Sequence, residues 1–185
     1  MSNNELVEII EIPDMPIIMS DGCRLSARVW MPLDAESAPV PAILEFLPYR
    51  KRDGTTARDC LTHPYFAKRG YACIRVDMRG NGDSEGIMLD EYTKQELDDA
   101  EFTVNWLAAQ TWCSGAVGMM GISWGGFNSL QVAAMQPDAL KAIITLFNFS
   151  KSIGVLKNSF IASSAPSFSS YQVLFHVPIG FVDLG

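Results

Sequence analysis

Gly121-Ile122-Ser123-Trp124-Gly125 is the stretch that decides the fold of this chain. The apolar residues 117–120 precede it, and a helix-like run over residues 126–135 follows it. A serine between a strand and a helix, with glycines two residues before and after it, is typical of a nucleophile elbow, whose tight turn leaves no room for side chains at the glycines. The serine Oγ would then project at the head of a helix, where the dipole and free N–H groups favour negative charge. An ordinary Gly-rich turn is the alternative, but the flanking pattern favours the elbow.

Strands and helices alternate outward from this turn. Residues 15–32 alternate around Asp21-Gly22 and predict an antiparallel hairpin, and residues 42–47, 71–76 and 141–146 predict further strands. Thr93 and Glu96 form a capping box for a helix in which apolar residues recur at helical spacing. We therefore predict the α/β class, with a mostly parallel sheet and helices on both faces.

The last part of the chain follows a different pattern. Residues 147–185 carry three charges, contain eight serines and show no convincing period of either kind. We predict two parts, residues 1–146 and an atypical tail, residues 147–185, that does not continue the first. A sheet that stopped after the strand at 141–146 would present an unpaired edge, where a second copy or a complementing chain could pair.

Composition and charge exclude several classes. A net charge of −7 disfavours nucleic acid as a partner, because phosphate binding needs a basic face. The four cysteines show no CxxC spacing and, with no signal peptide visible, predict a cytoplasmic protein. The uncharged run at 158–182 is interrupted by Pro166, His176 and Pro178, so we predict no membrane span.

Four ordered stretches give the chain a family resemblance. They are residues 47–51 (Leu-Pro-Tyr-Arg-Lys), residues 70–86 with Asp77-Met78-Arg79-Gly80, residues 106–112, and the elbow at 115–126. Together they resemble the α/β-hydrolases of the X-Pro dipeptidyl-peptidase and cocaine-esterase (CocE/NonD) type. The resemblance covers about residues 15–146 and implies the N-terminal part of such a catalytic domain, apparently truncated after the strand that follows the nucleophile helix.

The resemblance implies an acyl-transfer hydrolase that acts on a small ester, amide or peptide and needs no metal or organic cofactor. Ser123 would be the nucleophile. The backbone N–H of Trp124 and the hydroxyl of Tyr49 would donate to the oxyanion. A half-buried aromatic at a strand end is the alternative for Tyr49. We expect Asp77 to accept hydrogen bonds from loop amides, and Arg79 with its neighbouring glycines to shape a turn beside the elbow.

The base and the acid of a catalytic triad are harder to find. The sequence holds only His63 and His176, and α/β-hydrolases place the acid and then the histidine after the serine. We expect His63 to cap a helix at Thr62-His63-Pro64 or to lie at the surface. His176 has the correct order, but Asp138, the acid between it and Ser123, follows the far end of the nucleophile helix.

Three interpretations remain open. The chain is a serine hydrolase with impaired activity, a catalytically inactive remnant or interaction subunit without its acid and histidine, or a complete small esterase that uses His176.

Overall fold

The computed structural model describes residues 6–146, 160–162 and 171–175 of the chain. One eight-stranded sheet runs through these parts, with the strand order β1-β2-β4-β3-β5-β6-β8-β7. The strands are β1 (Ile9–Ile18), β2 (Arg24–Pro32), β3 (Val40–Leu47), β4 (Ala72–Asp77), β5 (Cys113–Ile122), β6 (Leu140–Leu146), β7 (Phe160–Ala162) and β8 (Tyr171–Phe175). The helices are α1 (Thr56–Ala67), α2 (Lys94–Ala108) and α3 (Trp124–Met135).

The predicted α/β sheet is present. Strands β4, β3, β5 and β6 lie parallel to one another, and β2 joins β4 antiparallel. Strands β1 and β2 form the predicted hairpin, in which Gly22 has a φ of 83°. Half of the predicted capping box forms: Thr93 is the N-cap of α2 and its side chain accepts from the Glu96 N–H, while the Glu96 carboxylate accepts from the N–H of Tyr92, one residue before the N-cap.

The tail differs from its prediction at the sheet edge. Strand β8 pairs antiparallel along β6, opposite residues Ala142 to Leu146, and β7 pairs with β8. The prediction of an unpaired edge at β6 is therefore wrong, because β8, a short segment of the tail, pairs along β6. The division of the chain at residue 146 stays a prediction.

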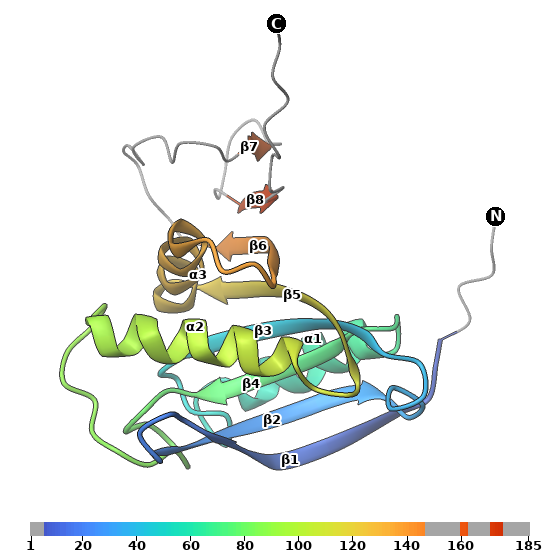
Figure 1. Ribbon diagram of the computed structural model, residues 1–185. Helices are drawn as coiled ribbons and strands as arrows, with labels where there is room; N and C mark the ends of the chain where they lie inside the picture. The colour runs from blue at the N-terminus through green and yellow to red at the C-terminus, as the bar shows by residue number, and fades with distance from the viewer. Residues whose placement is uncertain (1–5, 147–159, 163–170, 176–185) are drawn as a thin grey trace, which may run out of the picture.

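Helices cover the two faces of the sheet unequally (Figure 1). Helix α1 packs on β2 and β4, while α2 and α3 pack on the opposite face, over β3, β5 and β6. Buried side chains such as Leu44, Val117 and Ile143 form the core beneath α2 and α3. Because β3 and β5 pair in parallel, their carboxyl ends lie together at one end of the sheet.

The α1 side of β3, β5 and β6 is an apolar groove. It has a volume of about 290 Å³ and is lined by Ile43, Phe66, Met120, Ala142 and Ile144, among others. Along β5 and β6, residues that face α3 are buried, whereas their neighbours on the groove side are only half-buried. Parallel sheets are usually covered on both faces, so this groove is an unusual surface.

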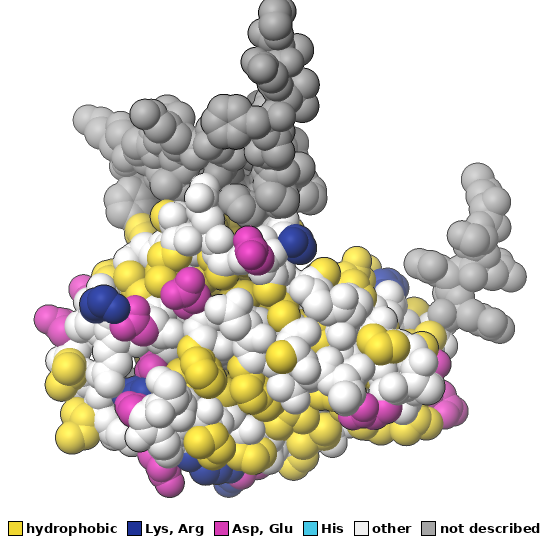
Figure 2. Space-filling view, in the orientation of Figure 1, with side chains coloured by type: hydrophobic (Ala, Val, Ile, Leu, Met, Phe, Trp, Pro, Cys, Tyr) yellow, Lys and Arg dark blue, Asp and Glu magenta, His cyan; other side chains and the backbone are white. Residues whose placement is uncertain are grey.

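The surface carries charges of both signs (Figure 2), and the described helices are too short to cross a membrane. On the face shown in Figure 2, basic side chains lie among acidic ones, and no histidine is visible among the described residues. The longest helix in the described part of the chain, α2, has 15 residues, and none there is long and apolar enough to cross a bilayer.

Candidate active site

Ser123 lies in a strained turn between β5 and α3. Its φ of 53° and ψ of −115° lie outside the regions that non-glycine residues normally adopt, and it is exposed at the head of α3. A Cβ at Gly121 would collide with the backbone of Gly125, lying 2.7 Å from its Cα, and a Cβ at Gly125 would lie 2.9 Å from Leu47 Cδ2. Close backbone approach thus requires glycine at 121, as an elbow needs, while Gly125 packs closely against the Leu47 side chain. The Ser123 side chain makes no capping hydrogen bond to α3.

Tyr49 follows the neighbouring strand at the same edge of the sheet. Strand β3 ends at Leu47 and pairs parallel with β5, so the loops that carry Tyr49 and Ser123 leave the sheet side by side. Tyr49 itself is half-buried. The next residue, Arg50, has a φ of 55°, a left-handed conformation that is uncommon for a non-glycine residue. The Tyr49 loop is therefore tightly shaped.

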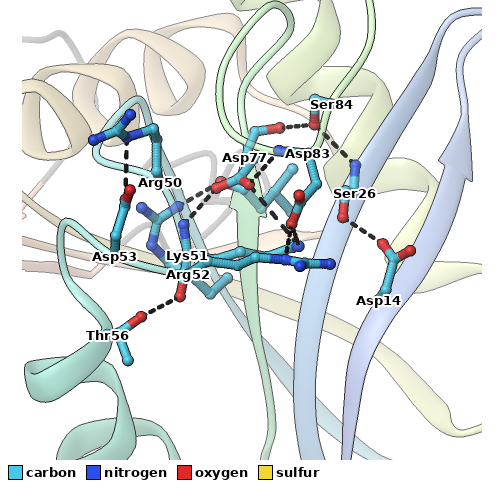
Figure 3. A network of polar contacts seen from close by, with 12 residues as sticks. Asp14, Ser26, Arg50, Lys51, Arg52, Asp53, Thr56, Asp77, Asp83 and Ser84 are labelled. Atoms are coloured by element: carbon cyan, nitrogen blue, oxygen red, sulfur yellow. Dashed lines mark hydrogen bonds and ion pairs between the residues drawn. The ribbon is translucent and has the colours of Figure 1, made fainter.

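A buried ion network holds the Tyr49 loop against the loop that follows β4 (Figure 3). The Lys51 N–H donates to Asp77 Oδ1 at 2.7 Å, and the Lys51 ammonium pairs with Asp83 and lies 3.9 Å from Asp77 Oδ2. Asp77 Oδ2 also accepts from the Asp83 N–H at 3.0 Å. Lys51 and Asp77 are fully buried. Asp77 thus binds loop amides, as its place after a strand predicts, and the network fixes both loops.

Arg79 anchors the other side of the loop after β4. Its guanidinium donates to both oxygens of Asp99 on α2, at 2.7 and 2.9 Å, and to Asp21 in the β1–β2 turn at 2.8 Å. The hydrogen bonds to these acids raise the pKa of Arg79 above its ordinary value. The predicted turn-shaping role of Arg79 fits this geometry.

Trp124 is half-buried and connects the elbow to α2. Its indole Nε1 donates to Glu96 Oε1 at 2.7 Å, and its ring lies 5.4 Å from that of Tyr92. Sequence reasoning identified Glu96 only as part of a capping box. The sequence pattern correctly predicted Glu96 at the start of α2. No sequence pattern indicates that Glu96 Oε1 accepts a hydrogen bond from the Trp124 indole.

His63 is neither a helix cap nor a surface residue, so that prediction is wrong. Helix α1 begins at Thr56, and His63 lies inside it, fully buried against the ring of Trp30 at 4.9 Å. Pro64 favoured a helix start because proline is common in the first turn, but here it lies inside the helix. Burial lowers the pKa of His63 to about 4. A buried imidazole between α1 and the sheet is not placed to serve Ser123.

His63 belongs to a buried charge cluster on the α1 face of the sheet. Its Nε2 lies 3.6 Å from Glu45 Oε2, and Arg58 donates to Glu45 at 2.6 Å and to Asp59 at 2.7 Å. Arg75 Nε lies 3.3 Å from Asp59 Oδ2. Glu45, Asp59 and His63 are close enough to share a metal ion, but the two guanidinium groups already balance the two carboxylates. Their chemistry fits a structural network that attaches α1 to the sheet better than a cation site.

The structure therefore brings together Ser123, Trp124 and Tyr49 at one edge, and within residues 6–146 it supplies no base for the serine. His63, the histidine of that part, is enclosed elsewhere. His176 lies outside the described residues. Asp138 follows the far end of α3, as the sequence predicts.

Comparisons with known proteins agree with this arrangement. The model of the X-Pro dipeptidyl-peptidase (S15) family matches residues 21–163. Cocaine esterase from Rhodococcus sp. is 38% identical over 129 residues, which cover 68% of this chain and 21% of the esterase. The chain thus spans about a fifth of the length of that relative.

Solved structures share the same fold. A CocE/NonD family hydrolase from Staphylococcus aureus superposes with a TM-score of 0.65 at 23% identity, over 75% of this chain and 28% of the hydrolase. Est1E from Butyrivibrio proteoclasticus, solved with ferulic acid bound, gives a TM-score of 0.55 at 27% identity, over 70% of this chain and 50% of Est1E. With the strained serine turn, the strand order and the family match over most of its length, the chain belongs to the X-Pro dipeptidyl-peptidase (S15) family.

Proposed function

We propose that this chain carries the nucleophile and the oxyanion site of a serine acyl-transfer hydrolase. The observation that carries the proposal is the strained Ser123, with a φ of 53°, at the head of α3, two residues after a glycine at which a Cβ would collide with backbone. Such a turn leaves the hydroxyl exposed for attack on an acyl carbon. The substrate class is a small ester, amide or peptide; the preference between ester and amide depends on groups beyond this site.

Two donors would stabilise the negative charge that develops on the acyl oxygen. The Trp124 N–H lies in the first turn of α3, where it has no partner within the helix. The Tyr49 hydroxyl comes from the loop that the Lys51 network fixes beside it. Preorganised donors of this kind usually contribute about 10²–10³ each in rate.

The serine still needs a base, and the two sources that can be tested with this chain are His176 and a second polypeptide. Titration with a fluorophosphonate probe separates these sources. Stoichiometric labelling of Ser123 that disappears in His176→Ala supports a complete small esterase. Labelling only after a second polypeptide is added supports complementation. An unlabelled Ser123 under every condition contradicts the proposal, provided that a denatured sample shows the serine to be chemically intact.

A catalytically inactive interaction subunit is the second candidate. The apolar groove on the α1 side of β3, β5 and β6 favours it, since no helix of the described residues covers this part of the sheet face and an exposed apolar face attracts another surface. On this alternative we expect the chain to be poorly soluble or to self-associate when expressed alone. A sharp monomer peak in size-exclusion chromatography, together with cooperative unfolding, would count against it.

A cytoplasmic location accords with the state of the cysteines. Cys23, Cys60, Cys73 and Cys113 are all free thiols. Free thiols are usual where glutathione and thioredoxin keep proteins reduced. Cell fractionation with an antibody against the chain tests the location.

A further inference from the structure

Glu96 makes more contacts than a helix cap requires. Its side chain is nearly fully buried, at 6% exposure, although it carries a carboxylate at the start of α2. One oxygen, Oε2, accepts from the Tyr92 N–H at 2.8 Å. The other, Oε1, accepts from the Trp124 indole at 2.7 Å. Only the first of these bonds belongs to helix capping; the second reaches across to the elbow.

Tyr92 supports the same contact from the other side. Its φ of 56° is left-handed, and the Glu96 carboxylate holds its backbone in that conformation. The Tyr92 ring then lies 5.4 Å from the ring of Trp124 and 5.6 Å from that of Phe127. These spacings are typical of favourable aromatic pairs. The Trp124 side chain is thus fixed by a carboxylate acceptor at its indole nitrogen and by a tilted contact with the Tyr92 ring.

Trp124 is the residue directly after Ser123, so holding its side chain also restrains the backbone of the elbow. Ser123 is strained, and a strained turn persists only where its surroundings determine it. We propose that Glu96 is a positioning residue: through the Trp124 indole it aims the Trp124 N–H at the oxyanion and holds the strained, positive-φ conformation of Ser123. The inference rests on the proposed function, since it assigns that N–H its role.

A capping role alone predicts different behaviour. A cap needs the bonds of Glu96 to Tyr92 and of Thr93 Oγ1 to the Glu96 N–H, and losing either partner would weaken it. Positioning needs the bond to the indole. Thr93→Ala therefore weakens the start of α2 while leaving the Trp124 contact in place, which makes it the matched control for Glu96→Ala and Glu96→Gln.

The first measurement is independent of activity. In ¹H–¹⁵N spectra of the full chain, the Trp124 indole resonance, assigned with Trp124→Phe, should lie downfield and move upfield in Glu96→Ala. Glu96→Gln keeps one acceptor oxygen for two donors and should give an intermediate shift. Trp30, whose indole donates to Glu11 Oε2 at 2.9 Å, provides the internal comparison: its resonance should respond to Glu11→Gln and not to any change at Glu96.

The second measurement is the rate of fluorophosphonate labelling at Ser123. Glu96→Ala and Trp124→Phe should each lower it roughly 10- to 100-fold, because misplacing a catalytic group by about 1 Å has effects of that size. The double variant should lose no more than either single variant, since both remove the same contact. Thr93→Ala should label at the rate of the unchanged chain.

The outcomes separate the two proposals. The positioning role is overturned if the Trp124 indole resonance does not shift in Glu96→Ala. It is also overturned if the losses in labelling rate of the two single variants multiply in the double variant. An unreactive Ser123 in the unchanged chain, with an indole resonance that still responds to Glu96, overturns the proposed function and leaves the contact itself established.

Discussion

Replacing Lys51 by methionine tests whether the ion network fixes the Tyr49 loop. Methionine keeps an unbranched apolar stem but removes the ammonium that pairs with Asp83 and lies near Asp77. Lys51 and Asp77 are fully buried, so the change leaves an uncompensated carboxylate inside the protein. Breaking a buried pair from one side usually costs about 3–5 kcal/mol.

The structure places Lys51→Met near the lower end of that range. Asp83 is 28% exposed and keeps its pairing with Arg52 at 2.5 Å. Asp77 keeps two backbone N–H donors, from Lys51 and Asp83. We therefore expect a loss of about 3 kcal/mol in the free energy of unfolding, which corresponds to a fall in Tm of roughly 6–12 °C for a domain of this size.

Urea unfolding at one protein concentration measures the change, with Lys94→Met as the control. Lys94 pairs with Asp98 at 2.6 Å but is 85% exposed, and exposed pairs contribute at most about 1 kcal/mol. The hydrogen bond from Lys51 lowers the pKa of Asp83 below its ordinary value. The stability that this bond supplies is therefore fully present above the unfolded pKa of about 3.9, and it is lost as the pH falls through the lower pKa of the folded protein. The difference between the two proteins should shrink at acidic pH. A Lys51→Met variant as stable at pH 7 as Lys94→Met would refute the reasoning.

Three further predictions follow from the site and the buried cluster. Gly121→Ala should abolish phosphonate labelling of Ser123, because its Cβ would meet the Gly125 backbone, whereas Gly118→Ala, whose Cβ would have its nearest neighbour at 3.6 Å, should label normally; equal labelling of both would contradict the elbow geometry. Tyr49→Phe should lower the labelling rate about 10²–10³-fold with less than about 1 kcal/mol change in stability, and an unchanged rate would leave Tyr49 as a packing residue. Burial raises the pKa of Glu45 to about 7 and lowers that of His63 to about 4, so their contributions to the pH dependence of stability oppose each other. Relative to the unchanged chain, Glu45→Gln should therefore gain stability as the pH rises from about 4.5 to 7, and His63→Gln should lose stability as the pH rises from about 4 to 6.5, as followed by urea midpoints. Parallel curves for the two variants would show that the two pKa values are not shifted in opposite directions.

The sequence predicted those parts of the fold that depend on local pattern. Apolar runs, the Asp21-Gly22 turn and the N-cap at Thr93 each determine their own segment, and all three are present. The elbow was also readable, because the glycine at 121 is required by contact with the backbone of Gly125, four residues away.

Long-range pairings were not readable in the same way. Glu96 binds an indole 28 positions away, and Lys51 binds a carboxylate 32 positions away; neither spacing carries a local signal. The prediction for His63 was wrong because Pro64 is typical of the beginning of a helix. In addition, α1 is buried against Glu45 on β3 and Arg75 on β4, and these strands lie on either side of the helix in the sequence, so no local pattern shows that they come together. The pairing of β8 with β6 reverses the direction of the preceding strands, which a β/α rhythm cannot indicate.

The strand order also has a consequence for how the protein is made. Strand β5 inserts beside β3 on the side away from β4, so the loops of Tyr49 and Ser123 become neighbours only after residues 50–112 have been synthesised. On the ribosome, the β1–β2 hairpin and the β3-α1-β4 unit can form first, with Tyr49 exposed at an unfinished edge. Closing the β3–β5 pair carries the entropy of a long loop and is expected to be a late step. A nascent chain stalled before β5 would expose the unpaired hydrogen-bonding edge of β3. We expect this species to be the one that a chaperone binds most strongly.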